Sequence, residues 1–412
     1  MLATLRPVLA LLLAVFLLMA GNGPLSTLIG VRLEAAGILP AIIGFVMAAY
    51  FAGLTLGSLF AYQLVTAFGH IRAFTAFASA LSGISLIYPL HFNPMLWGAL
   101  RLSEGFCMAG LFICVESWLN DSTTKETRGK VLACYMICLY SGQAGGQFML
   151  TLQDSSGFLL FILVSILISF AAIPVALTRA APPTLPHVES LSFRRLYQAS
   201  PLGVVGVITS GLILGSLYSL GPVFARDIGL DVSRTGLFMS AVIFGGVLLQ
   251  LPFGRLSDVF DRRLVIVGVL GLTVLVSGGS AATAGPDSTM LYGIALLFGG
   301  VSFALYPLCV AHTNDHLDAA ARVSASGGLI LAYSAGATLG PLLSSATMTL
   351  VGGWGLFAFT TAVSAATLIF GLWRMRVRPS PPADQQGPYQ ILPRTTPVAA
   401  PLDPRTEMEG SE

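Results

Sequence analysis

Two oppositely charged residues lie three positions apart inside an otherwise apolar stretch. The segment "LRLSEGFCMAG", residues 100–110, carries Arg101 and Glu104. Residues three apart share one face of a helix, so an ion pair between them is geometrically easy. A buried carboxyl beside a basic group can gain and lose a proton as its surroundings change, and the arginine can instead bind an anionic solute. The alternative interpretation is a permanent structural ion pair.

Three further polar side chains occur within apolar runs. Asn22 lies between two glycines, and we expect it either to face a cavity or to pack against the helix expected over 129–152. Tyr218 follows glycines that recur at helix-packing distances, and it is expected to face a cavity. Tyr306 precedes Pro307, which should kink its helix because proline lacks a backbone N–H. We expect Tyr306 to line a cavity or to lie at a membrane interface.

The composition indicates which elements must position these groups. Of 412 residues, 55% are hydrophobic and only 10% are charged, whereas a soluble domain carries about 25% charged residues. Most of the surface is therefore expected to face lipid. A membrane helix needs about 20 predominantly apolar residues. The chain has twelve such runs, at 7–29, 40–63, 71–90, 94–117, 129–152, 157–178, 200–224, 234–256, 263–284, 288–311, 323–348 and 352–373.

A polar break near the middle divides the chain. Residues 179–199 contain three prolines and form the longest internal gap between apolar runs. This break predicts an N-terminal unit of six helices, 1–178, and a C-terminal unit of six helices, 200–378. The tail 379–412 is polar and rich in proline, so it is expected to be disordered in the cytoplasm.

Basic residues predict the orientation in the membrane, because they collect in cytoplasmic loops. If the N-terminus is cytoplasmic, only Arg32, Arg226 and Arg234 fall on the opposite side. We therefore expect a multi-pass protein of the cytoplasmic (inner) membrane, with both termini and the linker in the cytoplasm. Fifteen basic residues then lie at cytoplasmic loops and helix ends, namely Arg6, Arg72, Lys125, Arg128, Lys130, Arg179, Arg194, Arg195, Arg255, Arg262, Arg263, Arg322, Arg374, Arg376 and Arg378.

One short cytoplasmic connection concentrates charge. Asp258 can pair with Arg262 one turn on, or with the N-terminus of a neighbouring helix, where the helix dipole favours an anion. Gly254 allows two helix backbones to approach closely. Such contacts hold only while the helices meet on the cytoplasmic side, so a gating latch is one interpretation and loop topology alone is the other. The connection reads "GRLSDVFDRR", and its charged residues are Arg255, Asp258, Asp261, Arg262 and Arg263.

This connection resembles the loop signature of the major facilitator superfamily. The stretch GRLSD at 254–258, followed by two arginines, is similar to the motif that this family places between helices 2 and 3 and again between helices 8 and 9. The equivalent first-half stretch, 57–74, keeps Gly57 and Arg72 but has Ala61 in place of the acid. The resemblance implies an all-α membrane protein with twelve transmembrane helices in two six-helix bundles. It also implies a stronger latch in the second half.

Longer stretches resemble the YcaD-like group of this superfamily. That group implies a fold and a mode of transport but no substrate. Arg101 with Gly105 is similar to the superfamily's helix 4 motif, whose arginine is associated with proton coupling. The expected fifth helix contains "SGQAGGQ" without the proline of many antiporters, which weakens the case for drug:proton antiport. The resembling stretches are 21–37, 101–121, 304–317 and 326–343.

Two acids near the expected cytoplasmic helix ends are assigned to gating. Glu116 ends the run 94–117, and its position favours a gate or hairpin role. Asp315 belongs to a cluster whose residue types suggest metal binding, but a solvated, charge-balanced loop beside Asp318 and Arg322 is favoured, so no metal site is expected. The other members of the cluster are His312, Asn314 and His316.

The sequence therefore predicts a secondary active transporter, not an enzyme. We expect it to move a small solute by alternating access with proton coupling, and export is favoured over import. The alternative is a transporter-fold sensor or assembly factor without solute flux. The chain has no HExxH and no phosphate-binding loop, so neither a metalloprotease nor ATP-driven transport is expected. The net charge of +2 does not suggest nucleic acid. A monomer without cofactors is expected.

Overall fold

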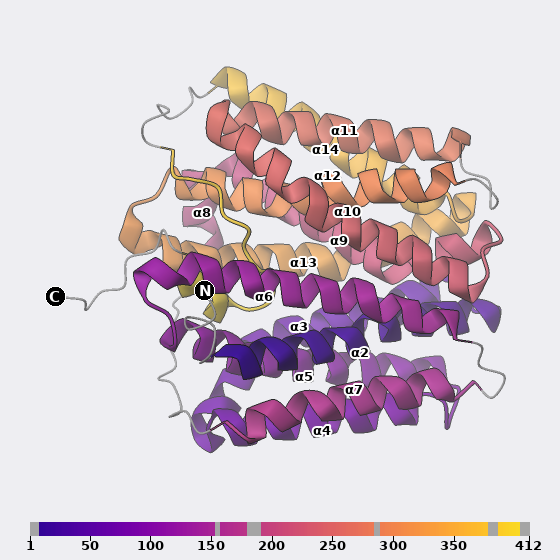
Figure 1. Cartoon of the computed structure of the whole chain (residues 1–412). Helices are drawn as coiled ribbons and strands as arrows, with labels where there is room; N and C mark the ends of the chain where they lie inside the picture. Colours follow the sequence, from indigo (N-terminus) through magenta and orange to yellow (C-terminus); the bar gives the residue numbers. More distant parts are fainter. Residues whose placement is uncertain (1–7, 153–156, 179–190, 284–288, 378–385, 404–412) are drawn as a thin grey trace.

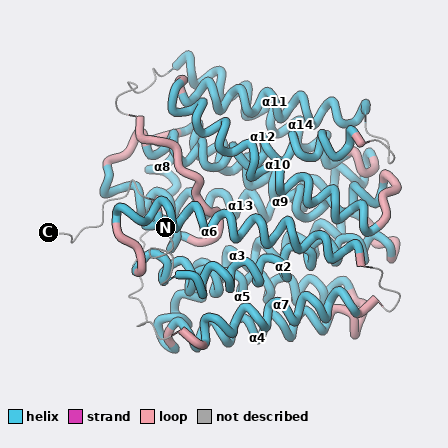
Figure 2. Tube along the Cα trace, viewed as in Figure 1, coloured by secondary structure: helices cyan, strands magenta, loops and turns pink. Residues whose placement is uncertain are grey.

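The computed structural model describes residues 8–152, 157–178, 191–283, 289–377 and 386–403. In this part of the chain every regular element is helical (Figure 2). The prediction of twelve long helices is confirmed (Figure 1). They are α2 (Leu9–Ala35), α3 (Pro40–Phe68), α4 (His70–Ile87), α5 (Pro94–Asp121), α6 (Lys125–Gly146), α7 (Leu159–Ala176), α9 (Pro201–Asp227), α10 (Val232–Val259), α11 (Arg262–Thr283), α12 (Met290–Asn314), α13 (Ala319–Val351) and α14 (Gly355–Val377). The shorter elements are η2 (Gln147–Thr151), α8 (Phe193–Ala199) and η4 (Pro397–Leu402).

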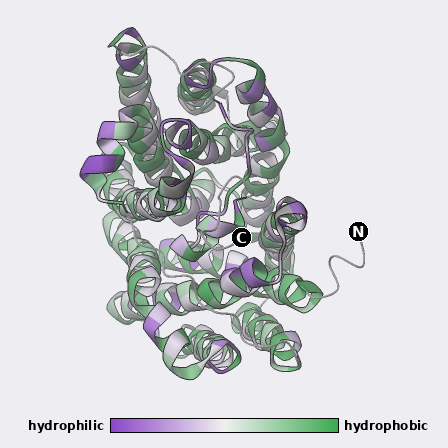
Figure 3. Ribbon diagram, turned by 90° about the vertical axis from the view of Figure 1, so that its left-hand side faces the viewer, coloured by the Kyte–Doolittle hydropathy of each residue, from purple (hydrophilic) through white to green (hydrophobic). Residues whose placement is uncertain are grey.

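The outer surface of the helices is apolar. In the described chain, 11 helices are long and apolar enough to cross a membrane. The long helix outside this set is α6, where four of the first six residues are charged. Large side chains such as Phe170, Leu275 and Ile369 are 53%, 70% and 67% exposed, and Figure 3 shows that apolar residues occur along the length of most helices. Contiguous exposed apolar surface of this kind needs lipid around it.

Polar side chains cap the start of two helices, and a glycine follows the end of the first helix in each half. Asn93 accepts hydrogen bonds at Oδ1 from the N–H groups of Met95 and Leu96 in α5, and Asp231 accepts one from Arg234 in α10. Gly37 and Gly229 follow the first helix of each half with φ of 70° and 94°. Glycine adopts this left-handed conformation without steric penalty. A glycine in this conformation after the first helix of each half is typical of two halves with one architecture.

Helices α2–α7 form one bundle and α9–α14 form the other (Figure 1). In the first bundle α3 packs tightly on α5, and in the second α10 packs tightly on α12. Glycines permit both contacts. A Cβ at Gly105 would overlap the carbonyl oxygen of Tyr50, and a Cβ at Gly245 would overlap that of Leu296. Small residues let membrane helices approach to backbone contact.

The bundles contact each other mainly at one end. We call the end where α2 begins and α14 ends the termini end, and the other the far end. At the far end α2 contacts α9, and the first turns of α10 contact α6 and η2. The same end of α3 meets α13, where a Cβ at Gly44 would overlap Ser345. At the termini end η4 lies between α5 and α13 instead.

The tail differs from the expected disordered segment in its described part. Residues 386–403 follow a defined course between the bundles, with Leu392, Val398 and Leu402 buried. These apolar side chains leave water for a slot between α5, α6 and α13. The average composition of the tail is polar and rich in proline, so it did not indicate that these apolar side chains would be buried. Residues 378–385 and 404–412 lie outside the described chain.

The linker also contains more structure than expected. Residues 193–199 form α8, which packs against α9 and α13 with Leu196 buried. The backbone N–H of Leu191 donates to the carbonyl of Ser324 at 2.9 Å. The remainder of the expected linker, 179–190, lies outside the described residues.

Candidate functional site

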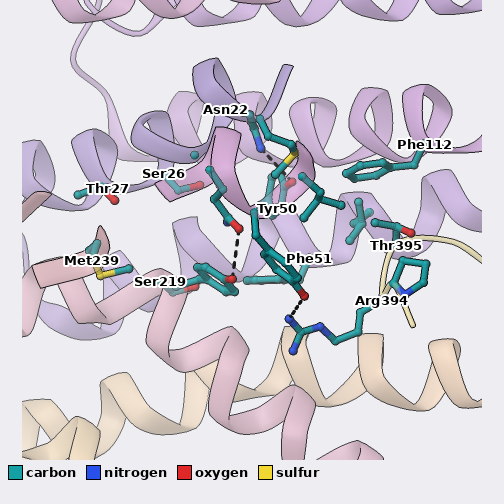
Figure 4. A pocket seen from close by; sticks show the side chains of 18 of the residues that line it. Asn22, Ser26, Thr27, Tyr50, Phe51, Phe112, Ser219, Met239, Arg394 and Thr395 are labelled. Carbon is teal, nitrogen blue, oxygen red and sulfur yellow. Dashed lines mark hydrogen bonds between the residues drawn. The ribbon is translucent and has the colours of Figure 1, made fainter. Parts of the chain in front are cut away.

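A cavity of about 120 Å³ lies between the two bundles. Its walls come from α2, α3, α5 and α6 of the first bundle, from η2, from α9, α10 and α13 of the second, and from the tail (Figure 4). Three residues that the sequence placed on a substrate or proton pathway line it together, namely Asn22, Arg101 and Tyr218.

The predicted pair of Arg101 and Glu104 is present and buried. Arg101 Nη1 lies 2.9 Å from Glu104 Oε1, with the two side chains 1% and 0% exposed. Arg101 Nη2 donates to Ser26 Oγ at 3.0 Å, and its guanidinium lies 4.3 Å from the ring centroid of Tyr50. The hydroxyl of Tyr88 donates to Glu104 Oε2 at 2.9 Å. Burying two charges is tolerable only with such compensation.

The two members of the pair lie at different depths behind the cavity wall. Arg101 lines the cavity, whereas Glu104 is not among the lining residues. Each carboxylate oxygen of Glu104 accepts one hydrogen bond, from Arg101 and from Tyr88. A solute in the cavity would therefore contact Arg101 directly and would interact with the Glu104 carboxylate only through Arg101.

Of the other expected pathway residues, two face the cavity and one does not. Asn22 is 5% exposed, lines the cavity and donates from Nδ2 to the hydroxyl of Tyr50 at 3.3 Å. Tyr218 lines the cavity and donates to Gln143 Oε1 at 3.4 Å. Tyr306 lies instead against the tail, in a small gap that Leu392 also lines.

Several cavity residues were missed by the sequence reasoning. On α6 and η2 the missed residues recur with helical spacing, which was an available signal. They are Met136, Tyr140, Gln143 and Gln147. Tyr333 lies in an apolar run of α13 and Arg394 in the tail, and neither position carries a local signal.

The tail reaches the cavity through Arg394 (Figure 4). Arg394 Nη2 donates to the hydroxyl of Tyr140 at 2.8 Å. Its guanidinium carbon lies 4.7 Å from the ring centroid of Phe303 and 5.8 Å from that of Tyr333. Within the described chain Arg394 makes no ion pair, and its Nη1 has no hydrogen-bond partner.

Glu116 differs from its expected position at the membrane interface. It is fully buried, because α5 continues past it to Asp121. The hydroxyl of Tyr135 donates to Glu116 Oε1 at 2.8 Å, and the tail hydroxyls of Thr395 and Thr396 donate to its two oxygens. In the described chain no basic side chain pairs with Glu116. Its contacts therefore hold the tail between the bundles.

The charged connection between α10 and α11 also holds the tail. Arg262 Nη2 lies 3.5 Å from Asp258 Oδ1, as one of the two expected pairings requires, and Arg262 also pairs with Asp315. Arg262 Nη2 donates to the carbonyl of Gly387 at 2.8 Å, and the backbone N–H of Tyr389 donates to Asp258 Oδ1 at 2.7 Å. The pairs of Arg262 with Asp258 and Asp315 join the ends of α10, α11 and α12, and the same side chains also contact the tail.

Other residues of this connection have separate surroundings. The ring of Tyr389 covers Gly254 so closely that a Cβ would overlap it. Arg255 is exposed. Arg263 Nη2 lies 2.7 Å from Asp261 Oδ2.

The equivalent positions of the first half are less connected. Gly57 lies within α3, where a Cβ would approach Ala109 Cβ of α5 at 2.6 Å. It therefore serves helix packing in this structure. Arg72 near the start of α4 is exposed.

The expected solvated loop around His312 is wrong. His312 and Asn314 are 5% and 2% exposed, because α12 continues through Asn314 and packs on α9. Asp315 follows as the C-cap and is charge-balanced by Arg262. Among the described residues no group of three His, Cys, Asp or Glu side chains could hold a metal ion.

Polar contacts join the bundles at the far end. Arg226 Nε of α9 lies 3.3 Å from Glu34 Oε2 of α2. Arg32 donates to the carbonyl of Gly157 at 3.0 Å. Although Arg32 and Glu34 are close in sequence, Glu34 pairs with Arg226 instead. Ser233 of α10 donates to the carbonyl of Leu150 at 3.4 Å.

Sequence comparisons agree with this architecture. The profile of the Major Facilitator Superfamily matches residues 11–242 and 203–402. An uncharacterized MFS-type transporter, YcaD, from Salmonella typhi is 30% identical over 391 residues, which cover 92% of this chain and 98% of that protein. YcaD from Salmonella typhimurium strain LT2 has the same identity and coverage.

Solved structures with the same fold are also transporters. The nucleoside transporter NupG superposes with a TM-score of 0.73 at 14% identity, covering 90% of this chain and 99% of that one. A bacterial homolog of the human lysosomal transporter Spinster, inward-facing and occupied, gives a TM-score of 0.70 at 16% identity, covering 92% and 96%. Fold and site thus define a membrane transporter rather than an enzyme. The chain belongs to the major facilitator superfamily, within its YcaD-like group.

Proposed function

We propose that this protein is a secondary active transporter that moves a small solute across the cytoplasmic membrane by alternating access. The observation that carries the proposal is the difference in bundle contacts between the two ends of the molecule. Contacts between the bundles close the far end, whereas η4 of the tail lies between them at the termini end. A cavity that can open at either end is what alternating access requires.

We further propose how transport is driven and in which direction the solute moves. Arg101 and Glu104 supply a buried, titratable pair beside the cavity, so we assign proton coupling to them. We also assign export, in which the solute enters the cavity from the termini end, which we place in the cytoplasm. The cavity is complete within one chain, which supports a functional monomer.

A bridge across the far end tests the proposed transport cycle. In a Glu34→Cys/Arg226→Cys variant, a short bismaleimide should join the bundles where these side chains now meet. The probe is a pooled panel of labelled organic cations, anions and neutral amphiphiles in proteoliposomes with an imposed pH gradient. We expect flux of at least one solute before bridging and none afterwards.

Single-cysteine variants treated with the same reagent are the control and should keep their flux. If the unbridged protein moves no solute of the panel, or if the bridge leaves flux unchanged, alternating access at this end is wrong. Absence of flux would favour the sensor or assembly alternative.

The proposed orientation gives a second expected result. Ser122 at the end of α5 and Ala36 at the end of α2 are exposed at opposite ends of the bundles. A membrane-impermeant maleimide should label Ala36→Cys in intact cells, and Ser122→Cys only in inside-out vesicles. Unmodified protein measures labelling of the native cysteines. The reverse labelling pattern would contradict cytoplasmic termini.

A further inference from the structure

A buried cation of the tail lies against aromatic side chains of both bundles. We call Tyr140, Tyr218, Phe303 and Tyr333 the aromatic site. Arg394 donates to Tyr140 at 2.8 Å and lies 4.7 Å from the Phe303 centroid. The rings of Tyr140 and Tyr218 have centroids 5.6 and 6.0 Å from that of Phe303. Aromatic faces attract cations, most strongly when water is excluded.

The charged groups in the described parts of the bundles hold the tail beside the aromatic site but do not pair with Arg394. The ion pair of Arg101 and Glu104 is neutral as a unit. Glu116 is buried and receives only hydroxyl donors, two of them from the tail residues next to Arg394. Within the described chain Arg394 makes no ion pair, so its buried charge is stabilised by Tyr140 and by the faces of the aromatic rings. A buried charge without such compensation is costly.

The wall of the cavity also offers hydrogen-bond acceptors without donors. Asn22 Oδ1 and Gln147 Oε1 are buried and have no partner among the described residues. Both residues line the cavity. An amide oxygen left without a donor suits a solute that carries several N–H groups.

We propose, on the premise of the proposed transport function, that the aromatic site is a substrate site for a small organic cation of the guanidinium type. Arg394 occupies this site as an internal competitor. The planar guanidinium group stacks on aromatic rings and donates hydrogen bonds in its plane. With the tail in place the remaining cavity is about 120 Å³, below the roughly 300–1,000 Å³ of ordinary small-molecule sites. The tail must therefore withdraw before a solute of ordinary size binds.

Equilibrium binding to the purified full-length protein tests this assignment without requiring flux. The probe is labelled benzylguanidine, and benzylurea is its neutral counterpart of similar shape. The Arg394→Ala variant should bind benzylguanidine at least about tenfold more tightly than wild type, because the competing cation is gone. Benzylurea should bind weakly to both.

Three variants identify the site. Phe303→Leu in the Arg394→Ala background should lower the affinity for benzylguanidine about tenfold, since the cation loses its aromatic face. Arg394→Lys should bind the probe as weakly as wild type. Gln390→Ala alters a tail residue outside the cavity and should leave binding at the wild-type level. Thermal unfolding curves confirm that each variant is folded.

Each contrary result has a definite meaning. Equal affinity of Arg394→Ala for benzylguanidine and benzylurea, or binding of neither, overturns the cation site. Unchanged affinity after Arg394→Ala overturns the competition. Selective binding without flux in the bridging experiment would leave the cation site standing and contradict the transport function. Flux of other solutes without cation binding would support the transport function and overturn the cation site.

Discussion

Glu104→Gln is expected to abolish transport driven by a pH gradient while downhill flux of the same solute stays partly intact. Glutamine has the shape of the protonated acid, so contacts to Arg101 and Tyr88 can persist without the charge. A coupled carrier needs a site whose charge changes between its two facing states. The measurement is solute flux in proteoliposomes with and without the gradient.

The partner substitution separates coupling from structure. Arg101→Ala leaves a fully buried carboxylate with Tyr88 as its remaining donor, and breaking a buried pair in this way costs about 3–5 kcal/mol. We expect a lower unfolding midpoint in detergent and no transport. The double variant Arg101→Leu/Glu104→Leu should recover stability but not proton coupling, because both charges are removed. Wild-type gradient dependence in Glu104→Gln would show that the proton is carried elsewhere and that this pair is a structural bridge.

Gly245→Leu is expected to prevent assembly of the second bundle. At this position α10 and α12 touch backbone to backbone, and even a Cβ would overlap the carbonyl oxygen of Leu296. Overpacking typically costs about 1–3 kcal/mol and sometimes more, and here the obstacle is rigid backbone. We expect little monodisperse protein after detergent extraction, measured by size-exclusion chromatography.

Gly268→Leu is the matched control, because Gly268 is an exposed helix residue of α11 with nothing within 4 Å of an added Cβ. It should be extracted like wild type. Normal yield and unfolding midpoint for Gly245→Leu would mean that α10 and α12 can separate without loss of the fold.

Local sequence information was sufficient for the helices and for the contacts within them. A run of apolar residues forms a membrane helix regardless of distant sequence, because lipid cannot satisfy an open backbone. The ion pair of Arg101 with Glu104 was predictable for a similar reason, because residues three apart lie on one face of a helix whatever the rest of the fold does. Asp258 lies at the end of α10 and Arg262 begins α11, and their pair was predictable because the connection between these two helices is very short.

Residues whose partners are distant in sequence could not be placed in this way. Glu116 was expected at an interface, and its burial depends on how far α5 continues and on what covers it. Tyr88, which donates to Glu104, lies at the C-terminal end of the preceding helix α4 and has no signature of its own. His312 was expected in a solvated loop, yet packing of α12 on α9 excludes water from it.

The sequence by itself determined that this chain is a twelve-helix membrane protein, which helix faces carry charge, and which superfamily it resembles. Only the tertiary structure determined which residues come into contact between the two bundles. Arg394 and Tyr140 are 254 positions apart, and their contact depends on a slot that two separate bundles form together. A segment of polar and proline-rich composition is disordered when nothing receives its few apolar side chains. Here the bundles receive Leu392 and Leu402 and bring Glu116 to the tail, and composition carries no information about such a slot.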